Sequence, residues 1–509
     1  MVTVWAALGL TVETALFVFA GLAWFLSRGY TFAEAGAGSI MAVFMAVSTI
    51  HQISFFLGSP LPGIILETVA LVAVVLLGVK RLPRLLKTLT SAVGLIRREP
   101  FSGAVIAVVW AAMAVLVGTT WFASDLSATD HPWRGLTSGW EMGGLHGTAP
   151  MMPLNATALF YHTARVGLGS QACGFGLLAY MAVGFSTYAL ARRYAWPAMA
   201  LTVTLLVLSM PRLVFLGLSP TAELVSTAAV VTGLVLIYRL VEQHRSLDLG
   251  LFLLCILFSI DANPMSIARV SVMTLLLGVV MTRRHGWLVW PELVASSSVA
   301  AVAATLLLTM GLSQMPVVAL NLVHGHPLLG VSVDFDNDGI LGAGANLIRY
   351  LLISIDPTEP IQRAVSWLMG WDLKAQLMRI HTAWVMPVFG QAGLHDRFTP
   401  IFSGGGQLGV GPFATLLIVP ALIHALVRGP RRLKATGLAW IGYLYLAALV
   451  VAWDHDSLSV LTPLYAACGF MVAFSLPPWR LRRRGLRLLQ ASFTLLLAWS
   501  IICAKSMLF

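Results

Sequence analysis

A polar segment follows directly on an apolar run near residue 120. It reads WFASDLSATDHPWRGLTSGW from Trp121 to Trp140 and holds Asp125, Asp130 and His131 among three tryptophans. Acidic side chains at the end of a membrane helix can simply be solvated at the interface. A carboxylate in that position can also take a proton from an acceptor hydroxyl. On these residues alone, both interpretations stay open.

Several polar residues lie inside or beside other apolar runs. Because polar groups inside a membrane are costly, each of them is a functional hypothesis. We expect them to converge near the outer leaflet, where an arginine binds a lipid phosphate through paired hydrogen bonds. The alternative is that Asp261 and Arg269 pair for structural reasons, or that both reach out to water. The set comprises Arg212, Glu223, Asp261, Asn263 and Arg269.

An acidic motif between residues 334 and 339 resembles the beginning of a calcium loop. Asp334, Asp336 and Asp338 alternate along the chain and Gly339 follows, as in D-x-D-x-D-G. The twelfth position is Ala345 and not glutamate, so the motif is not an EF-hand. It predicts either a calcium-type divalent cation with further ligands from elsewhere, or a solvated acidic turn.

The remaining motifs give weaker indications of a functional site. The outer histidines lack zinc-like spacing, and His324 and His326 have no third ligand nearby in the sequence. Asn155-Ala-Thr157 matches a glycosylation sequon. The sequence contains no G-x-S-x-G, P-loop or CxxC motif, which leaves acyl hydrolysis and ATP hydrolysis without support. The four cysteines lie in apolar segments and are predicted to be free thiols: Cys173, Cys255, Cys468 and Cys503.

The composition predicts an all-α polytopic membrane protein. Of the 509 residues, 58% are hydrophobic and only 10% are charged, and the mean hydropathy is +0.85. Runs long enough to cross a bilayer recur along the chain and predict about fourteen spans. They lie at 3–26, 36–57, 62–80, 101–122, 170–190, 197–211, 221–239, 248–262, 267–282, 293–313, 411–428, 435–453, 458–475 and 488–505. The first run continues toward the next span without a cleavage site, so no signal peptide is expected.

The +11 net charge is concentrated in short basic clusters between spans, which is the positive-inside pattern and not a nucleic-acid-binding one. This pattern places two long loops outside, at 123–170 and 314–410. Within them, segments 149–167 and 361–385 are predicted to lie along the membrane interface. The basic linker at 80–100 is expected to contact anionic inner-leaflet lipids. It closes an N-terminal segment at 1–100, before a core at 101–475 and a C-terminal segment at 476–509.

Together, several stretches resemble the bacterial GT-C glycosyltransferases of the protein-mannosyltransferase-like group. The family motif W-D-S-L-S-Y-H-x-P is similar to SDLSATDHP from Ser124 to Pro132. The hairpin at 189–240 resembles the family's hairpin, with Glu223 where an aspartate is usual. NLVHGHPLLG, beginning at Asn321, is similar to N-x-x-x-Y-G-N-P-L-G, and Asn346 with Arg349 and Gly409 to Pro412 also have counterparts. The likeness covers most of residues 100–475.

The resemblance implies transfer of a sugar from a polyprenyl phosphate to a glycan, lipid or protein acceptor outside a bacterial inner membrane. Asp125 would be the general base, with Asp130 and His131 positioning the acceptor or sharing that role. The residues that would bind the substrate or its lipid phosphate are Arg212, Glu223, Asp261, Asn263, Arg269, Asn321 and Arg349.

Two departures from the family keep other functions open. The family often has a lysine where this chain has Asp261-Ala-Asn263-Pro264, and an Arg-Tyr where it has Ser459-Val-Leu-Thr462-Pro463. Arg212, Arg269 or Arg349 would then have to contact the lipid phosphate. One alternative is a catalytically silent homologue that serves as an assembly partner. The other is a transporter or flippase for a lipid-linked glycan, although the two halves share no repeat and the polar groups concentrate outside.

Overall fold

The computed structural model describes residues 2–80, 154–164, 173–326, 337–403, 408–453, 458–476 and 483–508, apart from isolated positions within these ranges, and a few positions between 83 and 111. These residues are almost entirely helical, and no strand is formed among them. They divide into two compact units. Unit 1 comprises Met1–Ala189, Leu216–Val270 and Met281–Ser332, and unit 2 comprises Leu190–Phe215, Ser271–Val280 and Val333–Phe509.

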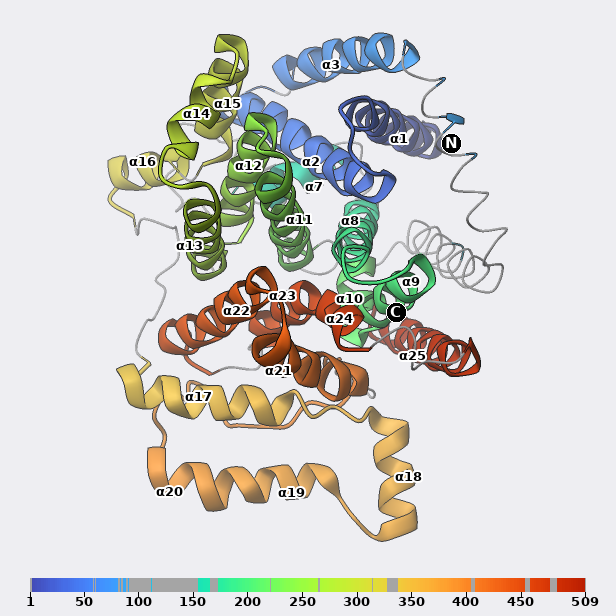
Figure 1. Ribbon diagram of the computed structural model, residues 1–509, viewed down its shortest axis with the longest axis vertical. Helices are drawn as coiled ribbons and strands as arrows, with labels where there is room; N and C mark the ends of the chain where they lie inside the picture. The colour runs from blue at the N-terminus through green and yellow to red at the C-terminus, as the bar shows by residue number, and fades with distance from the viewer. Residues whose placement is uncertain are drawn as a thin grey trace. The chain divides into compact units, whose positions relative to one another are not determined.

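Unit 1 is a helical bundle in which α2 (Phe32–Phe56) packs against α1 (Val2–Ser27), α3 (Leu61–Val79) and α7 (Asn155–Ala164) (Figure 1). α11 (Ala222–Gln243) packs along α12 (Ser246–Ala262). α2 begins at a capping box, in which Thr31 and Glu34 exchange side-chain and backbone hydrogen bonds. The other helices that lie wholly or mainly in this unit are α8 (Cys173–Ala191), α14 (Val289–Ala295), α15 (Val299–Leu312) and α16 (Met315–Val323), and the two ends of α13 (Ser266–His285) also belong to it.

Unit 2 contains a hairpin of helices that Figure 1 shows as three sides of a rectangle. α17 (Gly339–Ile353) forms one side and α18 (Glu359–Met369) the next. α19 (Leu373–Ile380), a π-helical turn (His381–Val385) and α20 (Met386–Phe389) form the returning side. The other elements are α9 (Pro197–Leu208), α10 (Pro211–Leu218), a π-helical turn (Ala414–Ile418), α21 (Val419–Arg428), α22 (Arg431–Val450), α23 (Leu458–Cys468), a 3-10 turn (Gly469–Met471), α24 (Val472–Ser475) and α25 (Arg483–Leu508).

Eight described helices are long and apolar enough to cross a membrane. A ninth span results if α9 and α10, bent by 73° at their junction, are counted together. The prediction of a polytopic all-α membrane protein is therefore confirmed at this level. Several predicted spans correspond to shorter or broken helices: α12 has 17 residues, and the region 293–313 is divided between α14 and α15. The predicted span at 101–122 lies outside the described residues.

One predicted interfacial segment is wrong. α7 lies within segment 149–167, yet Leu159, Phe160 and Tyr161 are buried between its neighbours in unit 1. Its Asn155 is fully buried and hydrogen bonded, so the glycosylation sequon is inaccessible there. Asn155 and His162, two polar side chains of this helix, are buried as well, so contacts with neighbouring helices decide its place.

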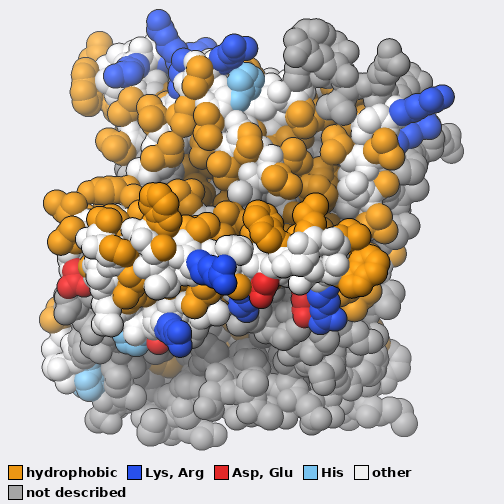
Figure 2. Space-filling view, turned by 90° about the horizontal axis from the view of Figure 1, so that it is seen from below, with side chains coloured by type: hydrophobic (Ala, Val, Ile, Leu, Met, Phe, Trp, Pro, Cys, Tyr) orange, Lys and Arg blue, Asp and Glu red, His pale blue; other side chains and the backbone are white. Residues whose placement is uncertain are grey.

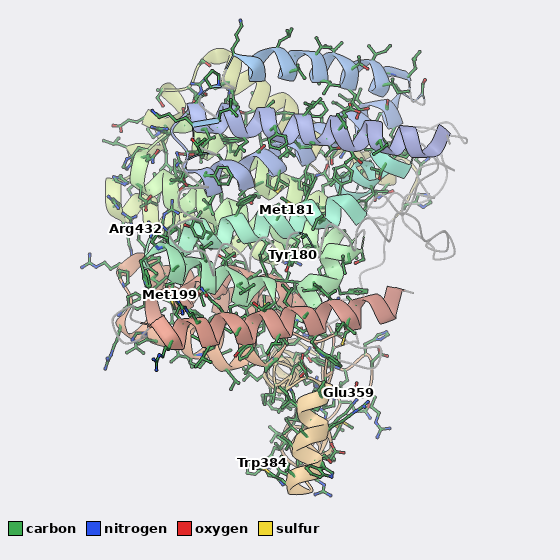
Figure 3. The ribbon with its side chains drawn as sticks, turned by 90° about the vertical axis from the view of Figure 1, so that its right-hand side faces the viewer. Tyr180, Met181, Met199, Glu359, Trp384 and Arg432 are labelled. Atoms are coloured by element: carbon green, nitrogen blue, oxygen red, sulfur yellow. The ribbon has the colours of Figure 1, made fainter. Side chains whose placement is uncertain are left out.

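The second predicted interfacial segment is strongly amphipathic. α18 has no buried residue, and it exposes Trp367, Leu368 and Met369. Figure 2 looks onto this end of the molecule and shows hydrophobic side chains at the surface with lysine and arginine among them. Within unit 2, α18 lies across the direction of α25, and Figure 3 labels Glu359 at its beginning and Trp384 on the returning segment. Tryptophan and basic residues on one helix are typical of the membrane–water interface.

Candidate functional site

The candidate site in unit 2 is built on one face of α17. Asn346 and Arg349 are three residues apart, so both side chains lie on the same face of the helix. Asp338 adopts a left-handed backbone conformation just before the helix, with φ of 50°. Gly342 is required for the close approach of this turn, because a Cβ there would lie 1.8 Å from the carbonyl oxygen of Asn337.

Arg349 is fully buried and makes three hydrogen bonds through two of its nitrogens. Nη1 donates to Asn346 Oδ1 at 2.6 Å and to the Ala392 carbonyl at 2.8 Å, and Nε donates to His381 Nε2 at 3.3 Å. Nη2 is buried without a hydrogen-bond partner. No carboxylate of the described residues lies within ion-pairing distance of this guanidinium. A buried cation with an unused donor is costly, so the arrangement favours an anionic ligand.

His381 is the neutral neighbour of this cation. Burial, together with the Arg349 charge, lowers the pKa of His381 from 6.5 to about 4. Because Nε2 accepts a hydrogen bond from Arg349, its proton lies on Nδ1. The ring stacks on Phe398 with centroids 4.3 Å apart. Near neutral pH, Arg349 is therefore the charged member of this pair.

A ladder of amides fixes α17 to the end of α22. Asn346 Nδ2 donates to Asn337 Oδ1 at 2.9 Å and to the Val451 carbonyl at 3.1 Å, and Asn337 Nδ2 donates to the Ala448 carbonyl. Gly393 N donates to the Asp338 carboxylate at 2.9 Å. A Cβ at Gly393 would lie 2.5 Å from Asn337 Oδ1, so only glycine fits this position. The ladder holds the Arg349 side chain in one orientation.

Sequence reasoning missed Asp356, which organises the neighbouring loops. Its buried carboxylate accepts hydrogen bonds from Thr358 N at 3.0 Å, Ser403 N at 2.9 Å, Ser403 Oγ at 2.5 Å and Gly411 N at 2.7 Å. Burial raises the pKa of this carboxyl, and the four donated bonds offset part of that rise. The only sequence signal for this role is a lone aspartate before a loop rich in serine, threonine and glycine. That pattern is common in surface loops, so it does not identify Asp356. We assign Asp356 a structural role.

Four predicted site residues lie in the helices of unit 1, each with its own neighbours. Arg269 of α13 is buried and donates from Nη1 to Ser226 Oγ at 3.2 Å. Glu223 is buried in the first turn of α11, and Asn263 caps α12 through its backbone. Asp261 is buried beside the Gln52 amide and the backbone of Leu154 and Asn155. Asp261 and Arg269 form no ion pair, so the structural pairing considered from the sequence is wrong.

Two other predicted residues lie apart from these. Asn321 is buried in α16 of unit 1 and accepts a backbone hydrogen bond from His326 at 2.8 Å. Arg212 lies in α10 of unit 2, where its backbone N–H donates to the Gly409 carbonyl at 3.0 Å. This backbone contact links Arg212 to the loop whose Gly411 N–H donates to Asp356.

The predicted catalytic residues Asp125, Asp130 and His131 lie outside the described residues, as do Asp334 and Asp336 of the predicted cation site. Asp338 is described, and it is exposed apart from the bond that it accepts from Gly393. Both the general base and the calcium-type site therefore stay predictions. Three of the four cysteines, Cys255, Cys468 and Cys503, are buried free thiols as expected.

The likeness to GT-C glycosyltransferases rests on the sequence motifs quoted above. Comparison of the chain with protein-family models, with curated proteins and with solved structures finds no match.

Proposed function

We propose that this chain is a membrane glycosyltransferase of the bacterial cell envelope. It transfers a sugar from a polyprenyl-phosphate donor to a glycan, lipid or protein acceptor at the outer face of the inner membrane. The proposal includes the finer architecture expected from the sequence, a GT-C-like arrangement with about fourteen spans and two outer loops. Eight to nine candidate spans among the described residues and the amphipathic helices α18 to α20 support it.

The observation that carries the proposal is the Arg349 guanidinium. Its Nη2 group presents two N–H donors, and no acceptor in the part of the chain that the structure describes takes them. During sugar transfer the bond between the anomeric carbon and the phosphate oxygen breaks, and the lipid phosphate gains one negative charge. A fixed cation beside that oxygen stabilises the transition state more than the ground state.

The segment that covers Arg349 is itself suited to the membrane interface. His381 and the Ala392 carbonyl contact the guanidinium, and both belong to the returning side of the α17–α20 hairpin. Gly390 and Gly393 adopt positive φ values there, 59° and 66°. A π-helical turn begins at His381, and such turns are frequent at functional sites. A lipid phosphate would reach Nη2 when this segment moves.

Sidedness within unit 2 agrees with an outer location. α22 has 20 residues, so it is about 30 Å long and can cross the hydrocarbon core. Basic residues Arg428, Arg431, Arg432 and Lys434 lie near its beginning, which the positive-inside rule places in the cytoplasm. Asn337 and Asn346 bind the carbonyls at its opposite end. Arg349 is therefore expected on the outer side.

In the proposed reaction, the acceptor oxygen attacks the anomeric carbon as Asp125 takes the hydroxyl proton. Asp130 and His131 position the acceptor, and the polyprenyl phosphate leaves with its bonding electron pair, its new charge stabilised by an arginine. The displacement inverts the anomeric centre. General-base assistance typically accelerates such a step by about 10²–10⁴-fold. The calcium-type ion considered at Asp334, Asp336 and Asp338 is not required by this scheme.

The test is transfer of radiolabelled sugar from a panel of polyprenyl-phosphate donors in membranes, with wild type beside Asp125→Asn. We expect label to move to an acceptor with the wild type and not with the variant. If Asp125→Asn transfers at the wild-type rate, Asp125 is not the base. If well-folded wild type transfers from no donor, the silent homologue or the transporter replaces the enzyme.

A further inference from the structure

A second cluster of ionisable side chains is buried in unit 1, and the proposed reaction uses none of its members. His51 of α2, Glu67 of α3 and His162 of α7 are 2%, 3% and 1% exposed. His162 Nδ1 lies 2.5 Å from Glu67 Oε1 and 3.3 Å from His51 Nε2, and His51 Nε2 lies 4.0 Å from the same carboxylate oxygen. Three helices thus bring two imidazole nitrogens and one carboxylate oxygen close together.

Local packing fixes α3 against α2 at this position. Gly63 N donates to Ser54 Oγ at 2.6 Å, and a Cβ at Gly63 would lie 2.4 Å from that oxygen. Only glycine allows this approach. Glu67 follows Gly63 by four residues and therefore lies one turn further along the same face of α3, opposite His51.

Asn155 fixes α7 against its neighbouring helices through four hydrogen bonds. Its Nδ2 donates to the carbonyls of Phe258 at 3.3 Å and Leu312 at 3.1 Å, and its Oδ1 accepts from Gln52. Ser48 Oγ donates to its backbone carbonyl at 2.7 Å. His162 lies two turns further along α7, on the face that carries Asn155. The positions of all three side chains are therefore set by contacts outside the cluster.

One of the three spacings matches a tetrahedral metal centre. Ligand atoms about 2.0–2.1 Å from a tetrahedral zinc ion lie about 3.3 Å from one another, and the separation of His51 Nε2 from His162 Nδ1 equals that value. Glu67 Oε1 lies 2.5 Å from His162 Nδ1, which is a hydrogen-bond distance, and 4.0 Å from His51 Nε2, so the carboxylate must shift between the two rings to bind the ion. The three potential ligand atoms all lie within 4.8 Å of one another.

We propose that His51 Nε2, His162 Nδ1 and Glu67 Oε1 bind one divalent transition-metal ion, with zinc as the best fit. Two imidazoles and one carboxylate are ligands that zinc accepts readily, and three protein ligands leave a fourth position for water or another donor. The ion joins α2, α3 and α7, so it stabilises unit 1. The competing explanation is a metal-free cluster in which the buried carboxylate and the two imidazoles share a proton. Measuring the metal content of the protein distinguishes the two explanations.

The experiment uses the full chain, purified in detergent with an affinity tag that contains no histidine. Metal content is measured by plasma mass spectrometry, and Co²⁺ is then titrated into metal-stripped protein. We expect about one zinc ion per chain, and visible absorption bands typical of tetrahedral Co²⁺ in a His₂-carboxylate site. Wild-type protein that holds no stoichiometric transition metal and gives no such bands overturns the proposal without any variant.

Variants test the ligand assignment. Glu67→Gln, His51→Gln and His162→Gln keep the side-chain size, and each should lose the metal. Controls of matched chemistry are His395→Gln and Glu359→Gln, whose side chains are exposed or only partly buried and belong to unit 2. Zinc retained by all three cluster variants, at the control level, would show that the metal binds elsewhere.

Folding is followed separately, by size-exclusion profile and thermal unfolding. Chelator should lower the midpoint of thermal unfolding of the wild type and of both controls by several degrees, because the ion binds only the folded state. It should leave Glu67→Gln unchanged. Equal sensitivity of wild type and Glu67→Gln to the chelator would contradict a stabilising metal at this cluster.

Discussion

At the scale of single residues, the informative feature is a charge without a counter-charge. Arg349 is enclosed by neutral groups, namely Asn346, His381 and the Ala392 carbonyl. By contrast, the buried Arg239 of unit 1 is paired with Glu34 at 2.6 Å and with Asp248 at 3.2 Å. Arg239 therefore has a structural role, whereas the Arg349 guanidinium can still bind an anionic ligand.

We expect Arg349→Lys to behave as a loss and not as a conservative change. Lysine is a point charge that reproduces neither the forked donor geometry nor the bonds to Asn346 and Ala392. Each charged hydrogen bond contributes about 1.5–3 kcal/mol, so kcat/KM for sugar transfer should fall about 10- to 100-fold. Arg363→Lys is the matched control, because its guanidinium is exposed and contacts only Glu359. Equal activity of both variants would remove Arg349 from the mechanism.

The depressed pKa of His381 predicts a pH dependence of stability. The ring is neutral in the folded protein above about pH 4, whereas the unfolded chain binds its proton below 6.5. Between these values the unfolded state holds more protons, so stability falls as pH falls from 6.5 to 4. Thermal unfolding in detergent across this range should show a smaller slope in His381→Gln, whose amide oxygen still accepts from Arg349. An identical slope in both proteins would contradict the assignment.

Residue identity predicted some of these sites and not others. Arg269 stands out because a charge within an apolar run is costly in a membrane, whereas Arg349 was selected only through the family resemblance. His51 and His162 are 111 positions apart, so no local spacing rule could join them to Glu67. Asn155 was read only as a sequon, and its buried role depends on carbonyls of α12 and α15. Long-range packing decides these contacts.

At the scale of elements, hydropathy predicts where helices occur but not where they break. In the predicted span 197–211 the helix α9 ends at Leu208. Pro211 begins α10 at a 73° bend, since proline lacks the N–H that would continue the helix. α7 was assigned to an interface and is buried instead. The predicted interfacial segment 361–385 overlaps the amphipathic helices α18 and α19, and its place at the membrane interface stays a prediction.

The ion cluster that joins α2, α11 and α12 predicts a large and asymmetric effect of mutation. Arg239 contacts both carboxylates and lies over the Tyr30 ring at 3.6 Å. Arg239→Met leaves two buried negative charges, which should cost about 3–5 kcal/mol, whereas Glu34→Gln leaves Asp248 to pair with the arginine. A thiol-reactive dye can follow unfolding, because Cys255, Cys468 and Cys503 are buried in the folded state. Comparable unfolding midpoints in the two variants would argue against a cooperative cluster.

At the scale of the whole molecule, the sidedness of unit 2 can be checked directly. In a Cys173→Ser background, we expect His395→Cys to react with a membrane-impermeant maleimide added to intact cells. Pro430→Cys should react only after the membrane is permeabilised. Both positions are exposed, and they lie near opposite ends of α22. Labelling of Pro430→Cys in intact cells would show that the topology is the reverse of the proposed one and would contradict the outer location of Arg349.

The burial of α11 bears on biogenesis. From Glu223 to Val241 no residue of this helix faces outward in unit 1, although it is among the most hydrophobic helices described. A helix that ends enclosed by protein gives up its lipid contacts after insertion, and its Arg239 finds Asp248 only when α12 has been synthesised. Until then Glu34 of α2 is its only carboxylate partner among the described residues. We therefore expect a nascent chain that stops between α11 and α12 to lack one of the two carboxylates that neutralise Arg239, and to be less stable in the membrane than a chain that includes α12.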